Sequence, residues 1–530
     1  MEKQTSLHKR RRSAKTNCAR IWCAILGLGI FLSGCMGTAG DRIHLSVAAA
    51  EFTFQREEII TGTAKQQTVL TGFLLGGHVA EIVVVNGDRG VRIYAFDEGT
   101  WGQKLEATLR PDVLFVDVAN IDGRDRLITY EPGRLNWFEP ESATEYALAE
   151  VTSIEPPPGG PLPHVDITHD VNGDGLDDLV VPALDGFWIF VQMKDSAFAE
   201  PMKLGTSTEE DSLYAVDGYR HQPWTQSRIH EMDYNRDGRI DLGFWNETHF
   251  EVHLQNAQGL FNPEAETFTT EVAFDSDLLS SLAAPHETRQ RQKDHGLTGK
   301  MTGSVLHAFT DMNGDNIADL GVFSLHGDLW NMHATYAVHF GNPTPDGGTV
   351  FSPEASTELL SDGIQFGMEQ HDFDFDGQSD MMFTILKPRV FKAIGMIIDS
   401  LVTGEVSMEL TFYRMENSSY SDKPTTSRSI RVETTGKSGE RSRYPSVLIG
   451  DVNGDKRADL LVQHGEKELR VFLGMPGPAL FAKRPQKVKV EMPHEEYTWL
   501  VALNKDGKQD VLMHHPSATE PHRVTLLIAR

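Results

Sequence analysis

A nine-residue acidic motif recurs along the chain and constrains its fold more than any other feature. The motif has the form Asp-x-Asn/Asp-x-Asp-x-x-x-Asp and is followed by an apolar run. Intact copies begin at Asp170, Asp233, Asp311, Asp372 and Asp451. Incomplete copies surround Asp122 and Asp506, and a further relic keeps only Glu81 before its apolar run. Self-similarity of this kind is typical of a repeat architecture rather than of several independent domains.

Each repeat has the pattern of four short strands. In the last intact repeat, "SVLIG" leads into the motif and "DLLVQ" follows its final acid. A third run, "ELRVFLG", alternates apolar and polar residues, and a fourth, "LFAKRPQKVKV", begins near an aromatic residue. Short apolar runs bounded by Gly, Asn and Asp are typical of strands rather than of helices. Four strands per unit predict an all-β fold of propeller blades.

The number of units predicts an eight-bladed β-propeller of four-stranded blades. The sequence stops at "HRVTLLIAR", which matches only the third strand of the eighth unit. Residues 51–60, "EFTFQREEII", match the fourth-strand pattern, so we expect them to complete the last blade and leave no open edge. Residues 51–530 would then form a single propeller domain. Seven blades remain the alternative if the Glu81 unit is not a true blade.

The motif resembles the start of an EF-hand calcium loop, but its later positions exclude that fold. Oxygen-bearing side chains occupy positions 1, 3 and 5, as in an EF-hand, which also requires a bidentate Glu at position 12. Here position 12 is apolar and lies inside the following run, as Val181, Phe244, Val322, Phe383 and Val462. The last acid comes at position 9 instead, so the loop leads from strand to strand.

This arrangement resembles the FG-GAP/VCBS repeat family, whose propellers include those of integrin α-subunits. The resemblance implies that the loop between the first two strands of a blade binds Ca²⁺ as its cofactor. The implied ligands are Asp170, Asn172, Asp174 and Asp178; Asp233, Asn235, Asp237 and Asp241; Asp311, Asn313, Asp315 and Asp319; Asp372, Asp374, Asp376 and Asp380; and Asp451, Asn453, Asp455 and Asp459. Asn316 and Lys456 replace the glycine of position 6. The alternative is a set of metal-free Asx turns.

The N-terminal segment has the pattern of an export signal. A basic stretch precedes the apolar run Ile21–Leu32, and the tetrapeptide ending at Cys35 resembles the lipobox of bacterial lipoproteins. The resemblance implies a signal peptide over residues 1–34, lipid on Cys35 and a lipidated linker over residues 35–50. Met36 after the cysteine points, by analogy with lipoprotein sorting, to the outer membrane. An ordinary signal peptide or an N-terminal anchor helix is the alternative.

The net charge restricts the kinds of partner that this chain can bind, and the positions of its cysteines restrict the disulfides that it can form. The net charge is −27, and loss of residues 1–34 would remove seven bases and one acid, which argues against nucleic acid as a partner. The three cysteines all lie at or before position 35, so no disulfide is expected within the propeller. The excess of acidic residues favours the binding of divalent cations.

Residues 277–300 and 388–404 interrupt the repeat and are expected to be helical or loop insertions. They either cap the propeller or build a binding surface. His249, Glu251 and His253 alternate on one strand face and could form a zinc site or a polar surface. The sequence contains no nucleophile-elbow, zinc-protease or phosphate-loop motif. The predicted function is a protein- or glycan-binding scaffold; the alternative is a carbohydrate-active enzyme such as a polysaccharide lyase, whose base needs no local motif.

Overall fold

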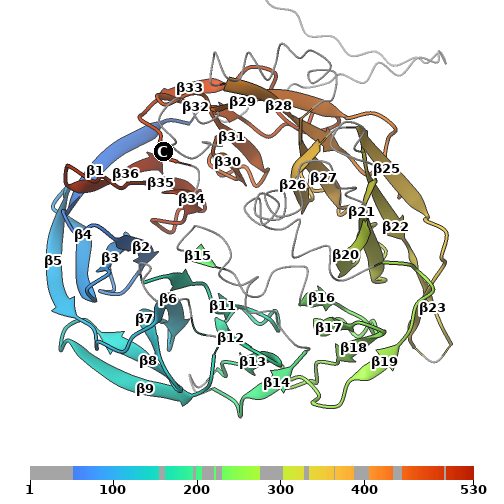
Figure 1. Ribbon diagram of the computed structural model, residues 1–530, viewed down its shortest axis with the longest axis horizontal. Helices are drawn as coiled ribbons and strands as arrows, with labels where there is room; N and C mark the ends of the chain where they lie inside the picture. Colours follow the sequence, from blue (N-terminus) through green and yellow to red (C-terminus); the bar gives the residue numbers. More distant parts are fainter. Residues whose placement is uncertain are drawn as a thin grey trace, which may run out of the picture. The chain divides into compact units, whose positions relative to one another are not determined.

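The repeats fold into eight antiparallel sheets arranged in a ring (Figure 1). The computed structural model describes residues 52–153, 155, 162–194, 198–205, 220–221, 229–274, 303–326, 333–345, 347–362, 364–386, 405–433, 445–494 and 497–530. These residues contain strands and turns but no α-helix. No helix in this part of the chain is long and apolar enough to cross a membrane. The predicted all-β propeller with eight four-stranded blades is confirmed.

We number the blades in chain order. Blade 1 is β2 (Gln67–Gly72), β3 (Glu81–Asn86), β4 (Gly90–Asp97) and β5 (Thr100–Thr108); blade 2 is β6 (Phe115–Ile121), β7 (Arg124–Glu131), β8 (Arg134–Glu139) and β9 (Thr144–Glu150). Blade 3 is β11 (Thr168–His169), β12 (Asp178–Ala183), β13 (Gly186–Phe190) and β14 (Met202–Leu204); blade 4 is β16 (His230–Met232), β17 (Asp241–Asn246), β18 (His249–His253) and β19 (Glu266–Phe268).

Blade 5 is β20 (Gly303–Thr310), β21 (Asp319–His326), β22 (His333–His339) and β25 (Thr357–Asp362); blade 6 is β26 (Ile364–His371), β27 (Asp380–Leu386), β28 (Glu405–Tyr413) and β29 (Thr426–Glu433). Blade 7 is β30 (Val447–Gly450), β31 (Asp459–Gln463), β32 (Glu468–Phe472) and β33 (Gln486–Lys489). Blade 8 is β34 (Thr498–Val501), β35 (Asp510–His515), β36 (His522–Ala529) and β1 (Phe54–Gly62).

The core lies between the blades. The second strand of a blade is buried on both faces, as in β3 and β12, where every residue is buried. Eight apolar clusters fill the eight junctions between neighbouring blades; Val83 of blade 1, for example, shares one with Leu127 and Phe138 of blade 2. Burying each such side chain contributes about 1.5–3 kcal/mol. Because the second strand is covered on both faces by neighbouring blades, it is continuously apolar rather than alternating.

The N-terminal strand closes the ring. β1 pairs antiparallel with β36, from Phe54 opposite Ala529 to Gly62 opposite His522. The closure expected of residues 51–60 is therefore confirmed, with the strand placed at Phe54–Gly62. The Glu81 unit is a complete blade, which settles eight blades over seven.

Two departures from the repeat were not predicted. β10 (His164–Val165) and β15 (Arg220–His221) extend blade 2 at its inner edge, with β10 parallel to both β6 and β15. A hairpin of β23 (Gly341–Pro343) and β24 (Thr349–Phe351) separates the third and fourth strands of blade 5.

Candidate calcium loops

The five intact motifs occupy the same place in five blades. Each connects the first strand of its blade to the second, over residues 170–178, 233–241, 311–319, 372–380 and 451–459 of blades 3 to 7. We call these the acidic loops. Because the first and second strands are equivalent in every blade, the acidic loops lie at one end of the ring.

The side chains at positions 1, 3 and 5 fold over the loop in the same way each time. The carboxylate at position 1 accepts the backbone N–H groups of positions 5 and 6; in blade 3, Asp170 accepts from Asp174 at 3.1 Å and from Gly175 at 2.8 Å. The carboxylate at position 5 accepts the N–H of position 7, as Asp174 does from Leu176 at 2.9 Å. The same bonds recur in the other four loops. These Asx-type bonds hold the carboxylates of each loop over its backbone, and in blade 6 one oxygen from each of Asp372, Asp374 and Asp376 lies within 4.8 Å of the others.

The backbone at position 6 is left-handed in all five acidic loops. Asn316 (φ 61°) and Lys456 (φ 66°) adopt the same left-handed conformation as the glycines of the other loops. Position 4 is left-handed too, which the sequence did not indicate, because Arg236 (φ 61°) and Phe375 (φ 59°) are residues that disfavour it. The loop geometry therefore overrides local preference at both positions.

The aspartate at position 9 has a structural role besides any role as a ligand. Its Oδ2 accepts the N–H of position 2 at 2.9–3.2 Å. Its Oδ1 accepts an N–H at or just beyond the end of the third strand at 2.7–2.9 Å. The residues that do this are fully buried: Asp178, Asp241, Asp319, Asp380, Asp459 and, in the incomplete blade 8 copy, Asp510. A buried carboxylate thus joins three segments of each of these blades.

The electrostatics of the acidic loops favour a cation. Burial, together with the carboxylates of Asp170 and Asp174, raises the pKa of Asp178 to about 7, although the bonds from Gln192 and Val171 act to lower it. The same causes raise the pKa of Asp380 to about 8. Several carboxylates therefore lie close enough to disfavour one another's ionisation. An all-oxygen donor set of this kind fits Ca²⁺, and a carboxylate oxygen that accepts one hydrogen bond keeps a further lone pair.

The acidic loops differ in their positive neighbours, a difference that sequence reasoning missed. In blade 6, Arg414 bonds Asp376 at 2.9 Å and also pairs with Asp374. In blade 7, Arg457 bonds Asp455 at 2.9 Å, and in blade 4, Arg239 pairs with Asp237. Among the described residues no lysine or arginine pairs with the loops of blades 3 and 5, where position 7 is Leu176 or Ile317. The sequence could have indicated Arg239 and Arg457, because both stand at position 7 of the motif, whereas Arg414 lies far from its partners in sequence.

Two of the three incomplete copies keep a buried carboxylate at the start of the second strand without the full donor set. In blade 8, Asp510 retains both bonds although position 1 is Ala502. In blade 1, Glu81 is buried and accepts the N–H of Leu75 at 3.1 Å. The blade 2 copy has Arg126 at position 9 and no acid there.

The remaining predictions divide into two groups. Cys35 and residues 1–34, 35–50, 277–300 and 388–404 lie wholly or almost wholly outside the described residues, so the lipidation site and the insertions stay predictions. The strand with His249, Glu251 and His253 is described: His249 lies 3.3 Å from Glu251, while His253 is buried and its Nδ1 bonds the backbone oxygen of Asn262 at 2.9 Å. This arrangement fits a strand with one half-exposed pair.

Comparisons with known proteins add little beyond the fold. No family model matches the chain, and no curated protein matches it. Among solved structures, Saccharomyces cerevisiae Sqt1 is 9% identical, with 91% of this chain and all of that chain covered and a TM-score of 0.37. The Nup133 β-propeller domain of Vanderwaltozyma polyspora is 8% identical over 91% and 99% of the chains, with a TM-score of 0.35. The WD40 domain of SCAP from fission yeast is 10% identical over 89% and 98%, also at 0.35. Similarity this low carries no functional argument.

Proposed function

We propose that this chain is a calcium-stabilised β-propeller, anchored to the outer membrane through lipid on Cys35, that binds a protein or a glycan on one face. The propeller scaffold is the observed fold. The observation that carries the calcium proposal is the repeated geometry of the acidic loops, in which the carboxylate at position 1 accepts the N–H of position 5 in all five loops at one end of the ring.

Calcium would stabilise the folded state by mass action. An ion that binds only the folded chain contributes about 2.7 kcal/mol per site at a hundredfold excess over its dissociation constant. We expect chelation with EDTA to lower the melting temperature markedly and added Ca²⁺, but not Mg²⁺, to restore it. A melt that EDTA leaves unchanged would contradict the calcium assignment.

The membrane anchor has its own test. We expect the wild-type chain, expressed in a Gram-negative host, to sediment with membranes, because several acyl chains give durable anchoring. Cys35→Ser lacks the proposed lipidated residue and should be released from the membranes. Cys23→Ser, which leaves the proposed lipobox intact, is the matched control. Sedimentation of Cys35→Ser with membranes would contradict lipidation.

Phe375 supports the acidic-loop end of the ring as the binding face. Its side chain is 58% exposed in the blade 6 loop, although its backbone is left-handed. An exposed aromatic residue held in a strained conformation is a candidate contact. We expect Phe375→Asn to weaken capture of a partner by cross-linking in the native envelope, or of a glycan on an array, relative to the wild type. Exposed Leu360→Asn, outside the acidic loops, serves as the control.

The enzymatic alternative receives no support from the described residues. His307 Nδ1 lies 3.0 Å from the Tyr336 hydroxyl, a pairing that resembles the base and acid of an elimination reaction. Tyr336, however, is fully buried in the cluster between blades 5 and 6, and burial raises its pKa far above the usual range. The pair therefore serves as a core hydrogen bond.

A further inference from the structure

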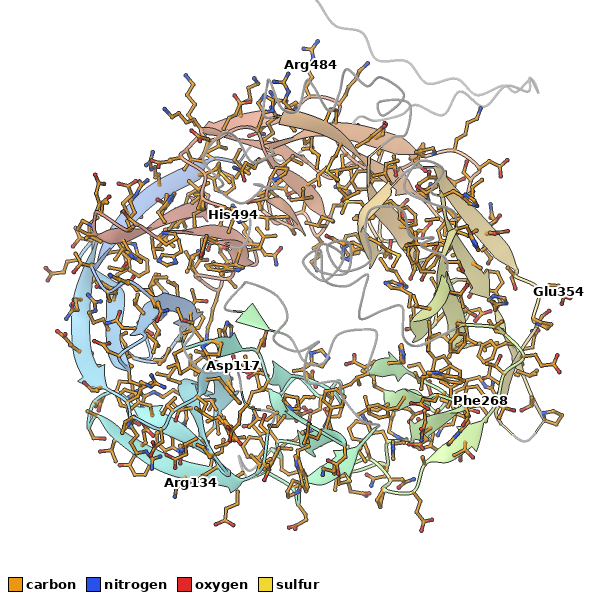
Figure 2. The ribbon with its side chains drawn as sticks, viewed as in Figure 1. Asp117, Arg134, Phe268, Glu354, Arg484 and His494 are labelled. Atoms are coloured by element: carbon orange, nitrogen blue, oxygen red, sulfur yellow. The ribbon has the colours of Figure 1, made fainter. Side chains whose placement is uncertain are left out.

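A second group of metal-ligating side chains lies apart from the acidic loops, at the inner edge of blade 2. Asp117, His164 and Asp166 each offer one ligand atom, and these atoms lie within 4.8 Å of one another. Figure 2 shows Asp117 on the inner part of its blade, whereas Glu354 and Arg484 lie at the outer rim. The group combines one imidazole with two carboxylates, so its donor chemistry differs from that of the all-oxygen loops.

The chain holds this group in place from two sides. The segment leading from blade 2 to blade 3 runs along β6, where the Val116 N–H bonds the Pro163 oxygen at 3.0 Å and β10 adds to the sheet. The same segment then turns over Asp117, whose Oδ2 accepts the Ile167 N–H at 2.9 Å and the Thr168 hydroxyl at 2.8 Å. Asp117 is 2% exposed, so its orientation is fixed by buried contacts.

The distance between the first two ligands suits a small divalent ion. His164 Nε2 lies 2.8 Å from Asp117 Oδ1. Two tetrahedral ligands at zinc bond lengths of about 2.0–2.1 Å stand roughly 3.3 Å apart, so the pair needs to open by only about half an ångström to admit the ion. Binding would displace the proton shared between these two atoms and release it to solvent.

The surrounding charges also favour a cation. The carboxylates of Asp117 and Asp166 lie close together in this group, and a bound cation would relieve the repulsion between them. The nearby His169 bonds Glu231 at 2.5 Å, so its interaction is with blade 4. Asp166 is partly exposed, which gives an ion a route from solvent.

We propose that Asp117 Oδ1, His164 Nε2 and a carboxylate oxygen of Asp166 bind a divalent transition-metal ion of the zinc class, with water in the remaining position. Imidazole together with carboxylate suits zinc and its neighbours rather than calcium. The ion would fasten the blade 2 to blade 3 connection to β6 at the inner edge of the ring. An open coordination position there would be available to an anionic or carbonyl group of a ligand.

The test uses Co²⁺ as a spectroscopic probe on the full chain in detergent, with Ca²⁺ in large excess to fill the acidic loops. We expect one equivalent of Co²⁺ to produce visible ligand-field bands, and Zn²⁺ to abolish them. Asp166→Asn should weaken Co²⁺ binding about tenfold or more, since even groups behind the ligands change metal affinity by about 10–100-fold. His249→Gln, which alters the half-exposed histidine of blade 4, should leave the binding unchanged.

Asp166→Asn is the decisive variant because Asp117 keeps its bonds to His164, Ile167 and Thr168, whereas His164→Gln removes one partner of a buried carboxylate. A cooperative melt in Ca²⁺ shows that the variant is folded, and its loss of Co²⁺ binding then reports the ligand itself. Thiolate charge-transfer bands would identify binding by Cys18, Cys23 or Cys35 instead. Absence of the bands in the wild type, or equal bands in Asp166→Asn, would overturn the proposal.

Discussion

The Asp177 carboxylate accepts the backbone N–H of Asn120 at 2.6 Å and thereby joins the acidic loop of blade 3 to the incomplete loop of blade 2. Position 8 also links neighbouring loops elsewhere in the ring, but there its backbone donates: the Ser379 N–H bonds the Met312 oxygen at 2.8 Å, and the Gln509 N–H bonds the Asp451 oxygen at 2.7 Å. The loops are therefore held to one another as well as to their own blades, and a change in one loop is expected to affect its neighbour.

The first prediction concerns this link. Asp177→Ala leaves the Asn120 N–H without its acceptor in a part-buried site, which is expected to cost about 1–3 kcal/mol of unfolding free energy. Asp177→Asn keeps an acceptor oxygen and should cost less. Denaturant titration in saturating Ca²⁺ measures both values. Asp185→Ala, which removes an exposed pair with Lys203, is the control and should have little effect on stability. If Asp177→Ala lowers the unfolding free energy no more than this control does, the link between the two loops does not contribute to stability.

The second prediction separates the structural role of the aspartate at position 9 from any role in metal binding. Asp510→Ala leaves two buried N–H groups, of Leu503 and Ala529, unsatisfied and is expected to cost about 3 kcal/mol even in EDTA. Asp506→Ala changes an exposed residue of the same loop and should have little effect in EDTA. Thermal melts of both variants with and without Ca²⁺ provide the measurement. If Asp510→Ala is harmless in EDTA, the aspartate at position 9 acts only through a metal.

Repetition explains why so much of the fold could be predicted. A pattern that recurs at every blade averages out local ambiguity, so the strands, their number and the closing role of β1 followed from the sequence. Short additions such as β10 carry no periodic signal and were missed. Convergence was missed as well: Asp117 and His164 are 47 residues apart and meet only through the parallel pairing of β10 with β6. The left-handed backbone of Phe375 went unpredicted because loop geometry overrides its residue preference.

The third prediction concerns the different positive neighbours of the acidic loops. The Arg457 guanidinium competes with a cation for the Asp455 carboxylate. Arg457→Leu gives position 7 the character of Leu176 in blade 3, and removal of a pair worth up to about 1 kcal/mol should raise the calcium affinity of this loop roughly fivefold. Calcium titration against a chromophoric chelator measures the change.

The control for this variant is Arg110→Leu, which removes an arginine paired with Glu131 and Glu145 in blade 2 and should leave every calcium affinity unchanged. Calcium binding that is unchanged or weaker in Arg457→Leu would show that the arginine does not compete with the ion.

The fourth prediction is that the packing between blades 4 and 5 makes the stability of the fold sensitive to acid. Burial, with a smaller contribution from His307, lowers the pKa of His230 to about 3. Its Nε2 is buried without a hydrogen-bond partner among the described residues, and its ring packs edge-on against Phe309 with the ring centroids 6.2 Å apart. Above an unfolded pKa of about 6.5, both states hold the neutral ring and no penalty arises. As the pH falls from about 6.5 toward 3, the unfolded chain binds a proton that the folded chain does not, so stability is lost.

His230→Phe removes this titration and keeps an aromatic ring against Phe309. We expect the variant to match the wild type near pH 7.5 and to be the more stable of the two at pH 5, by a margin that grows as the pH falls. Melting temperatures in the presence of Ca²⁺ at several pH values give the comparison. His249→Phe, which replaces a half-exposed histidine of the same blade, is expected to retain the acid sensitivity of the wild type. Parallel pH profiles for the wild type and His230→Phe would show that His230 does not contribute to acid sensitivity.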